Sequence, residues 1–179
     1  MFRVLLLSLG ALLTACSMYS RYKEPGPIDG HWRVVEMVCE KGDYTKAGKK
    51  LHEYYEAPTV RRIMYVERDV MQTVITQKEN KELGHKDCTT KIKTPFTVNG
   101  HTLTARTNVV KKESDSNPDC KGERTIKKEN VATYELDGSV LKMKRTGNIS
   151  RINEKNPERV CKASPFVIVF EKILDGNFL

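Results

Sequence analysis

The sequence predicts an all-β domain built as an eight-stranded antiparallel up-and-down barrel. Two observations carry this prediction. Strand-like runs follow one another from residue 30 onward, and short and long connections alternate between them. Thr and Val are plentiful, whereas Ala is scarce outside the first fifteen residues, and this composition favours strands. The length of 179 residues fits one domain of ordinary size.

The individual strands are predicted from apolar and β-branched runs bounded by turn residues. We expect them at residues 31–39, 59–67, 70–78, 88–97, 101–111, 124–136, 139–146 and 165–173. Asn99-Gly100 and Asp137-Gly138 are strong hairpin signals between neighbouring runs. Glu67-Arg68-Asp69 separates two runs closely enough for a third tight turn. The stretch 43–56 has room for a short helix that ends before Pro58.

The connections between these strands alternate in length. The long ones are 40–58, 79–87, 112–123 and 147–164, and the short ones are 67–69, 98–100 and 137–138. Alternate connections of an up-and-down meander lie at the same end, so the long loops should gather at one end and the tight hairpins at the other. Eight strands close into a barrel that has room for one small ligand. We therefore expect a barrel with one open mouth.

The N-terminal segment predicts export. The apolar run Val4 to Leu13 follows Arg3 and is shorter than the roughly 20 residues that span a bilayer, which is typical of a secretory signal peptide. The residues that end it, Leu13-Thr14-Ala15-Cys16, resemble the lipobox of bacterial lipoproteins: an aliphatic residue, two small residues and Cys. This resemblance implies cleavage before Cys16 and a diacylglycerol on its thiol.

The lipobox divides the chain into a signal peptide (1–15), a polar tether (16–29) and the predicted barrel domain (30–179). Acyl chains on Cys16 anchor the protein in a lipid membrane, because each buried CH₂ group contributes about 0.8 kcal/mol. Ser17, rather than Asp, at the next position resembles the outer-membrane signal of enteric-type bacteria. We therefore expect a lipid-anchored protein of the bacterial cell envelope, on the outer membrane and facing the periplasm.

The remaining cysteines of the chain, which has five in all, are Cys39, Cys88, Cys120 and Cys161. An exported protein meets an oxidising compartment, so these four should pair. Three connectivities are open. The meander selects Cys39–Cys161 and Cys88–Cys120, because each pair then joins neighbouring strands at the open end. A zinc site of four thiols is the alternative, but no Cys-x-x-Cys pair is present, and we expect no metal and no cofactor.

The first predicted strand opens with Gly30-His31-Trp32, which resembles the Gly-x-Trp motif of lipocalins. The resemblance implies a lipocalin- or calycin-like barrel in which Trp32 lies under the closed end and a basic residue of the last strand packs over it. Lys172, in PFVIVFEKIL, is placed for that role, where lipocalins have Arg. The second lipocalin motif, Thr-Asp-Tyr, is absent. The resemblance therefore implies a fold and no particular ligand.

Alternate residues of a strand face the same side of the sheet, which places one apolar series toward the interior. The expected pocket residues are Met64, Ile92, Leu103, Ala105, Met143, Phe166, Ile168 and Phe170. The alternative is that they simply fill a packed core. Lysines near the mouth would either attract an anionic head group or form a solvated rim. These are Lys46, Lys49, Lys50, Lys111, Lys112 and Lys121.

The motifs indicate binding without catalysis. Gly-x-Ser-x-Gly, His-Glu-x-x-His and phosphate-loop patterns are absent, and the four histidines are isolated: His31, His52, His85 and His101. The net charge of +8 comes from residues scattered along the chain. The basic residues do not alternate with aromatic residues as they do on nucleic-acid-binding surfaces. We expect a small hydrophobic or amphipathic ligand and no nucleic acid. The alternative is an envelope module that binds a protein, similar to lipoprotein lysozyme inhibitors, with a filled barrel.

Overall fold

The computed structural model describes residues 26–145 and 160–174, apart from the side chain of residue 128. The predicted signal peptide and the lipobox at Cys16 lie outside these residues. The strands are β1 (Gly30–Cys39), β2 (Val60–Glu67), β3 (Val70–Gln77), β4 (Cys88–Asn99), β5 (Thr102–Glu113), β6 (Gly122–Asp137), β7 (Val140–Arg145) and β8 (Phe166–Lys172). One helix, α2 (Lys46–Glu56), lies between β1 and β2. In the described part of the chain, no helix has the length and apolar character needed to cross a membrane.

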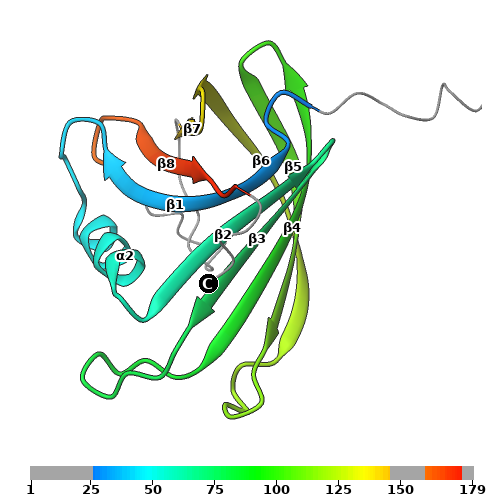
Figure 1. The fold of residues 1–179 in the computed structure, drawn as a ribbon. Helices are drawn as coiled ribbons and strands as arrows, with labels where there is room; N and C mark the ends of the chain where they lie inside the picture. Colours follow the sequence, from blue (N-terminus) through cyan, green and yellow to red (C-terminus); the bar gives the residue numbers. More distant parts are fainter. Residues whose placement is uncertain (1–25, 146–159, 175–179) are drawn as a thin grey trace, which may run out of the picture.

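The strands pair in chain order, each antiparallel to the next, and β8 pairs back with β1 (Figure 1). The eight strands therefore form a closed ring, which confirms the predicted antiparallel up-and-down order and the short helix in the first long connection. The largest boundary differences, two residues, fall at the ends of β4 and β5 and at the start of β6. The additional residues are strand residues because they pair across the ladder. Lys112, near the end of β5, pairs with Gly122 at the start of β6.

Tight hairpins gather at one end of the ring, which we call the closed end (Figure 1). Arg68, Gly100 and Gly138 turn these hairpins with φ of 56°, 56° and 55°, in the left-handed region that hairpin turns need. Arg68 is the non-glycine residue among them, and its backbone N–H donates to Asp29 Oδ1 at 2.9 Å. Asp29 thereby ties the chain that enters β1 to the β2–β3 hairpin.

The helix α2 begins three residues later than the predicted stretch because Thr45 caps it. Thr45 Oγ1 accepts from Gly48 N at 2.9 Å and donates to Val160 O at 3.1 Å. Gly48 is buried against the same carbonyl, and a Cβ there would lie 1.9 Å from Val160 O. Glycine is therefore required for the close approach of α2 to the segment that precedes β8.

Large apolar side chains fill the ring toward its closed end. The largest fully buried ones are Trp32, Phe170, Ile28, Met64, Leu141, Met143 and Ile168. Trp32 Nε1 donates to Ile28 O at 2.9 Å, and Lys172 Nζ lies 5.7 Å from the centroid of the Trp32 ring. Lys172 therefore lies over the tryptophan, in the position that the resemblance to lipocalins implies. This packed layer forms the floor of the space inside the ring.

Candidate ligand-binding cavity

A cavity of about 450 Å³ lies inside the ring, between the packed floor and the open end. Its apolar lining residues are Met37, Leu51, Met71, Ile75, Ile92, Val110, Ile126, Phe166 and Ile168. Its neutral polar and tyrosine lining residues are Tyr54, Tyr55, Thr73, Thr90, Thr94, Asn108 and Asn130. Apolar walls with a few polar groups, in a volume of roughly 300–1,000 Å³, are typical of small-molecule sites.

The structure divides the predicted pocket residues between the cavity and the floor. Ile92, Phe166 and Ile168 line the cavity. Phe166 and Ile168 also belong to the core cluster, so they form its boundary with the cavity. The others lie in the core cluster or pack against it and do not line the cavity: Met64, Leu103, Ala105, Met143 and Phe170. Alternation along a strand tells which side a residue faces but not how far along the axis it lies. Both interpretations of the apolar series therefore apply, each to a different level of the ring.

Four cations also line the cavity: Arg62 on β2, Lys112 on β5, Arg124 on β6 and Arg145 on β7. Lys112 and Arg124 are exposed, whereas Arg62 and Arg145 are half-buried. The described residues that line the cavity include no Asp and no Glu. An apolar-walled cavity with charge of one sign concentrates the electrostatic field, so this site attracts anions.

Cations on the outer surface are arranged differently. Arg33 pairs with Glu171 at 2.7 Å, and Arg106 pairs with Glu129 at 3.2 Å. Lys144, the neighbour of Arg145 in the chain, contacts Glu135 at 3.2 Å as well as a second acid. Lys144 therefore has acidic partners on the outside of β7, while the next residue turns its charge into the cavity.

The inner arginines have incompletely satisfied side chains. The Nε atoms of Arg62 and Arg145 are both buried and have no hydrogen-bond partner within the described residues. Arg62 donates from Nη1 to Met37 Sδ at 3.6 Å, and its guanidinium lies 5.2 Å from the centroid of the Tyr55 ring. Thioether sulfur is a weak acceptor. These contacts orient Arg62 without neutralising it.

The environment of Arg145 shifts the pKa of its guanidinium. Burial, and then the positive charge of Arg62, lower the pKa of Arg145 to about 10, while Tyr55 acts in the opposite direction. Arg145 therefore remains a cation near neutral pH. Among the residues that the structure describes, no acidic side chain pairs with Arg145, and a buried charge without such a partner is destabilising. The two arginines thus place repelling positive charges in one partly dehydrated space.

Helix α2 forms part of the cavity wall, because its Leu51, Tyr54 and Tyr55 are lining residues. The hydroxyl of Tyr54 donates to Gln77 Oε1 at 2.6 Å, which fixes the helix to the end of β3. A second contact joins the helix to β1, where His52 Nδ1 lies 2.8 Å from the backbone oxygen of Met37. The stretch 43–56 predicts a helix in a long loop, but its sequence does not indicate that the helix forms part of the cavity wall.

The lysines predicted near the mouth are mostly outside the cavity. Lys112 lines it, whereas the α2 lysines Lys46, Lys49 and Lys50 are exposed and are not lining residues. Lys111 pairs with Glu113 at 3.4 Å. Lys121 is also exposed and outside the lining. The cavity cations are thus mainly arginines on the strands.

Two disulfides brace the open end. The structure joins Cys39 to Cys161, with Cα atoms 5.7 Å apart, and Cys88 to Cys120, with Cα atoms 5.6 Å apart. This is the pairing that the sequence predicts. The first bond ties the end of β1 to the segment before β8, and the second ties the start of β4 to the β5–β6 loop.

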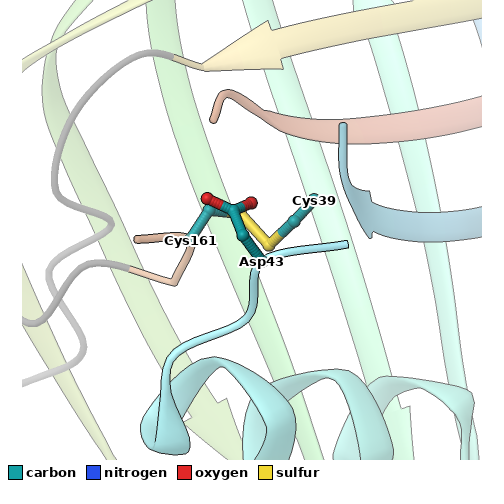
Figure 2. A group of neighbouring side chains, drawn as sticks. All are labelled: Cys39, Asp43 and Cys161. Carbon is teal, nitrogen blue, oxygen red and sulfur yellow. A yellow bond between two sulfur atoms is a disulfide. The ribbon is translucent and has the colours of Figure 1, made fainter. Parts of the chain in front are cut away.

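One group of potential metal ligands comes together among the described residues: Cys39, Asp43 and Cys161, with ligand atoms within 4.8 Å of one another. Figure 2 shows the two sulfurs joined in the disulfide, with the Asp43 carboxylate beside it. Cysteine binds metals as a thiolate, and the two sulfurs of this disulfide are not thiolates. The carboxylate accepts from Ala163 N at 2.7 Å and from Ser164 N at 3.0 Å. The group is therefore a structural tie at the mouth.

Comparisons with protein-family models, with curated proteins and with solved structures find no match for this chain. Function must therefore be argued from the cavity. Arg62 and Arg145 are not among the residues predicted for the pocket, although the sequence contains a signal for them. Arg62 lies two residues before Met64, and Arg145 lies two residues after Met143. Both arginines share the face of a residue that the alternation already placed inside.

Proposed function

We propose that this protein is a binding protein that takes a small amphipathic molecule into its strand ring. The observation that carries the proposal is the cavity of about 450 Å³, with apolar walls and convergent polar groups above a packed floor. Pockets of this size and lining bury most of the surface of a small ligand. The proposed activity is binding, and it requires no catalytic residue.

We place the domain in a lipocalin-like class. The support is the position of Gly30-His31-Trp32 at the start of β1 and of Lys172 over the indole. Gly30 has a φ of +139°, and a Cβ there would lie 3.0 Å from Lys172 Cε. The motif glycine thus allows the lysine to reach across to the tryptophan. A fold does not determine a ligand, so ligand chemistry must come from the cavity itself.

The envelope location is part of the same proposal. Two disulfides support an oxidising compartment, and the lipobox ending at Cys16 supports an acyl anchor. The alternative, a protein-binding envelope module, was expected to have a filled interior. The cavity favours the small-ligand proposal over that alternative.

A binding assay with Nile red, a neutral hydrophobic dye, tests the proposal. We expect saturable binding to the folded, disulfide-bonded domain. Ile92→Trp, which fills the cavity from β4, should weaken binding at least tenfold. Lys93→Trp, which adds the same side chain at the next, exposed position of β4, should leave binding unchanged.

Native mass spectrometry of the purified protein provides the second measurement. A co-purified small molecule that is present in the wild type and absent from Ile92→Trp supports the proposal. Equal dye binding by the wild type and a well-folded Ile92→Trp variant would contradict it, because the dye would then occupy another surface. Circular dichroism and thermal unfolding establish whether each variant is folded.

A further inference from the structure

The inner arginines of the cavity identify the chemistry of its ligand. Arg62 and Arg145 lie on β2 and β7, and both line the same cavity. Their Nε–H groups are buried without acceptors among the described residues, and the described lining supplies no carboxylate. Buried polar groups are normally hydrogen-bonded, so an exception at a cavity wall needs an explanation.

We propose that Arg62 and Arg145 together bind an oxyanion inside the cavity, so that the ligand is a single-chain amphiphile with a carboxylate or phosphate head. This inference rests on the proposed function and names its ligand class. A guanidinium presents planar, paired donors that match both kinds of head. One anion between the two arginines would satisfy their free donors and compensate their mutual repulsion.

The surroundings of the arginines fit this role. Tyr55 lies under the Arg62 guanidinium and restricts its motion, so less side-chain entropy is lost when an anion binds. The exposed cations Lys112 and Arg124 also line the cavity. They would draw an anion toward the cavity over a distance set by salt screening, while the inner pair would hold it.

The rest of the cavity fits an apolar tail. Ile92 on β4 and Phe166 and Ile168 on β8 supply apolar lining from two separate parts of the ring, and Phe166 pairs with Arg145 across β7 and β8. The volume of about 450 Å³ lies in the lower half of the range for small-molecule pockets. A single acyl chain is therefore a better match than a lipid with two chains.

The test compares three probes that share one tail: dodecanoate, dodecyl phosphate and dodecanol. Isothermal titration calorimetry on the disulfide-bonded wild type should show that at least one anionic probe binds tenfold or more tightly than dodecanol, since hydrogen bonds to charged groups are the stronger kind. Inorganic phosphate serves as a fourth probe, because it separates a lipid head group from a free anion.

Variants assign the preference to the inner arginines. Arg62→Met and Arg145→Met should each lose most of the preference for the anionic probes while still binding dodecanol. Arg61→Met is the matched control, because Arg61 is the preceding residue on β2 and is exposed. Arg62→Lys keeps the charge and should keep part of the preference, and it replaces the Met variant if that variant does not fold.

The outcomes separate the inference from the function on which it rests. Equal affinity of the wild type for dodecanol and both anionic probes overturns the anion site and leaves the binding function intact. If neither the tailed probes nor Nile red binds, the proposed binding function is wrong, and the inference of an amphiphilic ligand is wrong with it. Thermal stabilisation by inorganic phosphate that the Met variants lose would still support the oxyanion site, with a free anion as its occupant.

Discussion

The carboxylate of Asp43 shows how much a single side chain organises at the mouth. It accepts from the backbone of Ala163 and Ser164 and from the Ser164 hydroxyl. These bonds, the Ser164 hydroxyl first, lower the pKa of Asp43 to about 2. A lowered carboxyl pKa means that the folded state favours the ionised form.

Protonation of Asp43 in acid should therefore lower the free energy of unfolding of the protein. Its contribution is fully present above the ordinary carboxyl pKa of about 3.9 and is lost as the pH falls through about 2. Asp43→Asn should be less stable than the wild type at pH 7, and the difference should shrink toward pH 2. Urea unfolding at both pH values measures this, with Asp115→Asn, an exposed carboxylate, as the control. A difference that stays constant with pH would contradict the assignment.

The contact of Lys172 with Trp32 provides a second test at the residue scale. A cation over an indole contributes about 0.5–1 kcal/mol at exposed sites, and Lys172 is exposed while Trp32 is buried. Lys172→Met keeps the aliphatic stem and should lower the free energy of unfolding by about that amount. Lys172→Arg should restore it. Lys142→Met, on the exposed side of β7, is the control, and an equal loss there would assign the effect to net charge.

At the scale of elements, α2 depends on the contact between Gly48 and Val160. In an exposed helix, Gly→Ala stabilises by about 1 kcal/mol. Here the added methyl would lie 1.9 Å from a backbone oxygen, and overpacking of this kind destabilises by about 1–3 kcal/mol. We therefore expect Gly48→Ala to lower stability, although propensity alone predicts the reverse.

The same variant should affect the cavity, because α2 supplies Tyr54 and Tyr55 to its wall. Gly48→Ala is expected to weaken Nile red binding as well as thermal stability. Lys50→Ala, on an exposed position of α2, should change neither. An increase in melting temperature for Gly48→Ala would show that the helix does not dock through this residue.

The elements were predictable because their turns carry strong local signals. Gly100 and Gly138, the glycines of the Asn99-Gly100 and Asp137-Gly138 signals, adopt the left-handed φ that tight hairpin turns need. The contents of the cavity were less predictable for a physical reason. The pairing register shifts within β1–β8, β4–β5 and β5–β6, and such bulges change which residues share a level of the ring. Inward direction can be read from alternation, but depth depends on this register.

At the scale of the whole molecule, the two disulfides differ in the length of chain they close. Cys39–Cys161 spans 122 residues and Cys88–Cys120 spans 32. In the chain-entropy model these loops correspond to about 5 and about 4 kcal/mol. Replacing the first pair with Ala should therefore destabilise the protein at least as much as replacing the second. Urea unfolding of the two double variants measures this, and a clearly larger loss for the second pair would contradict the model.

The predicted lipid anchor is also tested on the whole protein. Cys16→Ser removes the acylated thiol and should shift the protein from the membrane fraction to the soluble fraction after cell lysis. The ring and both disulfides should still form, because none of their residues changes. Ser17→Ala is the control for the neighbouring position, and a Cys16→Ser protein that stays acylated would rule out the lipobox prediction.

The place where the chain enters β1 has a consequence for how cargo is exchanged. Gly26 and Asp29 lie beside the β2–β3 hairpin, at the closed end, and β1 then runs to Cys39 at the mouth. With the anchor that we propose at Cys16, the tether joins the end of the ring away from the mouth. An anchor at that end leaves the mouth free to open toward the aqueous compartment. We therefore expect cargo to enter and leave on the aqueous side, without contact between the mouth and the bilayer that holds the anchor.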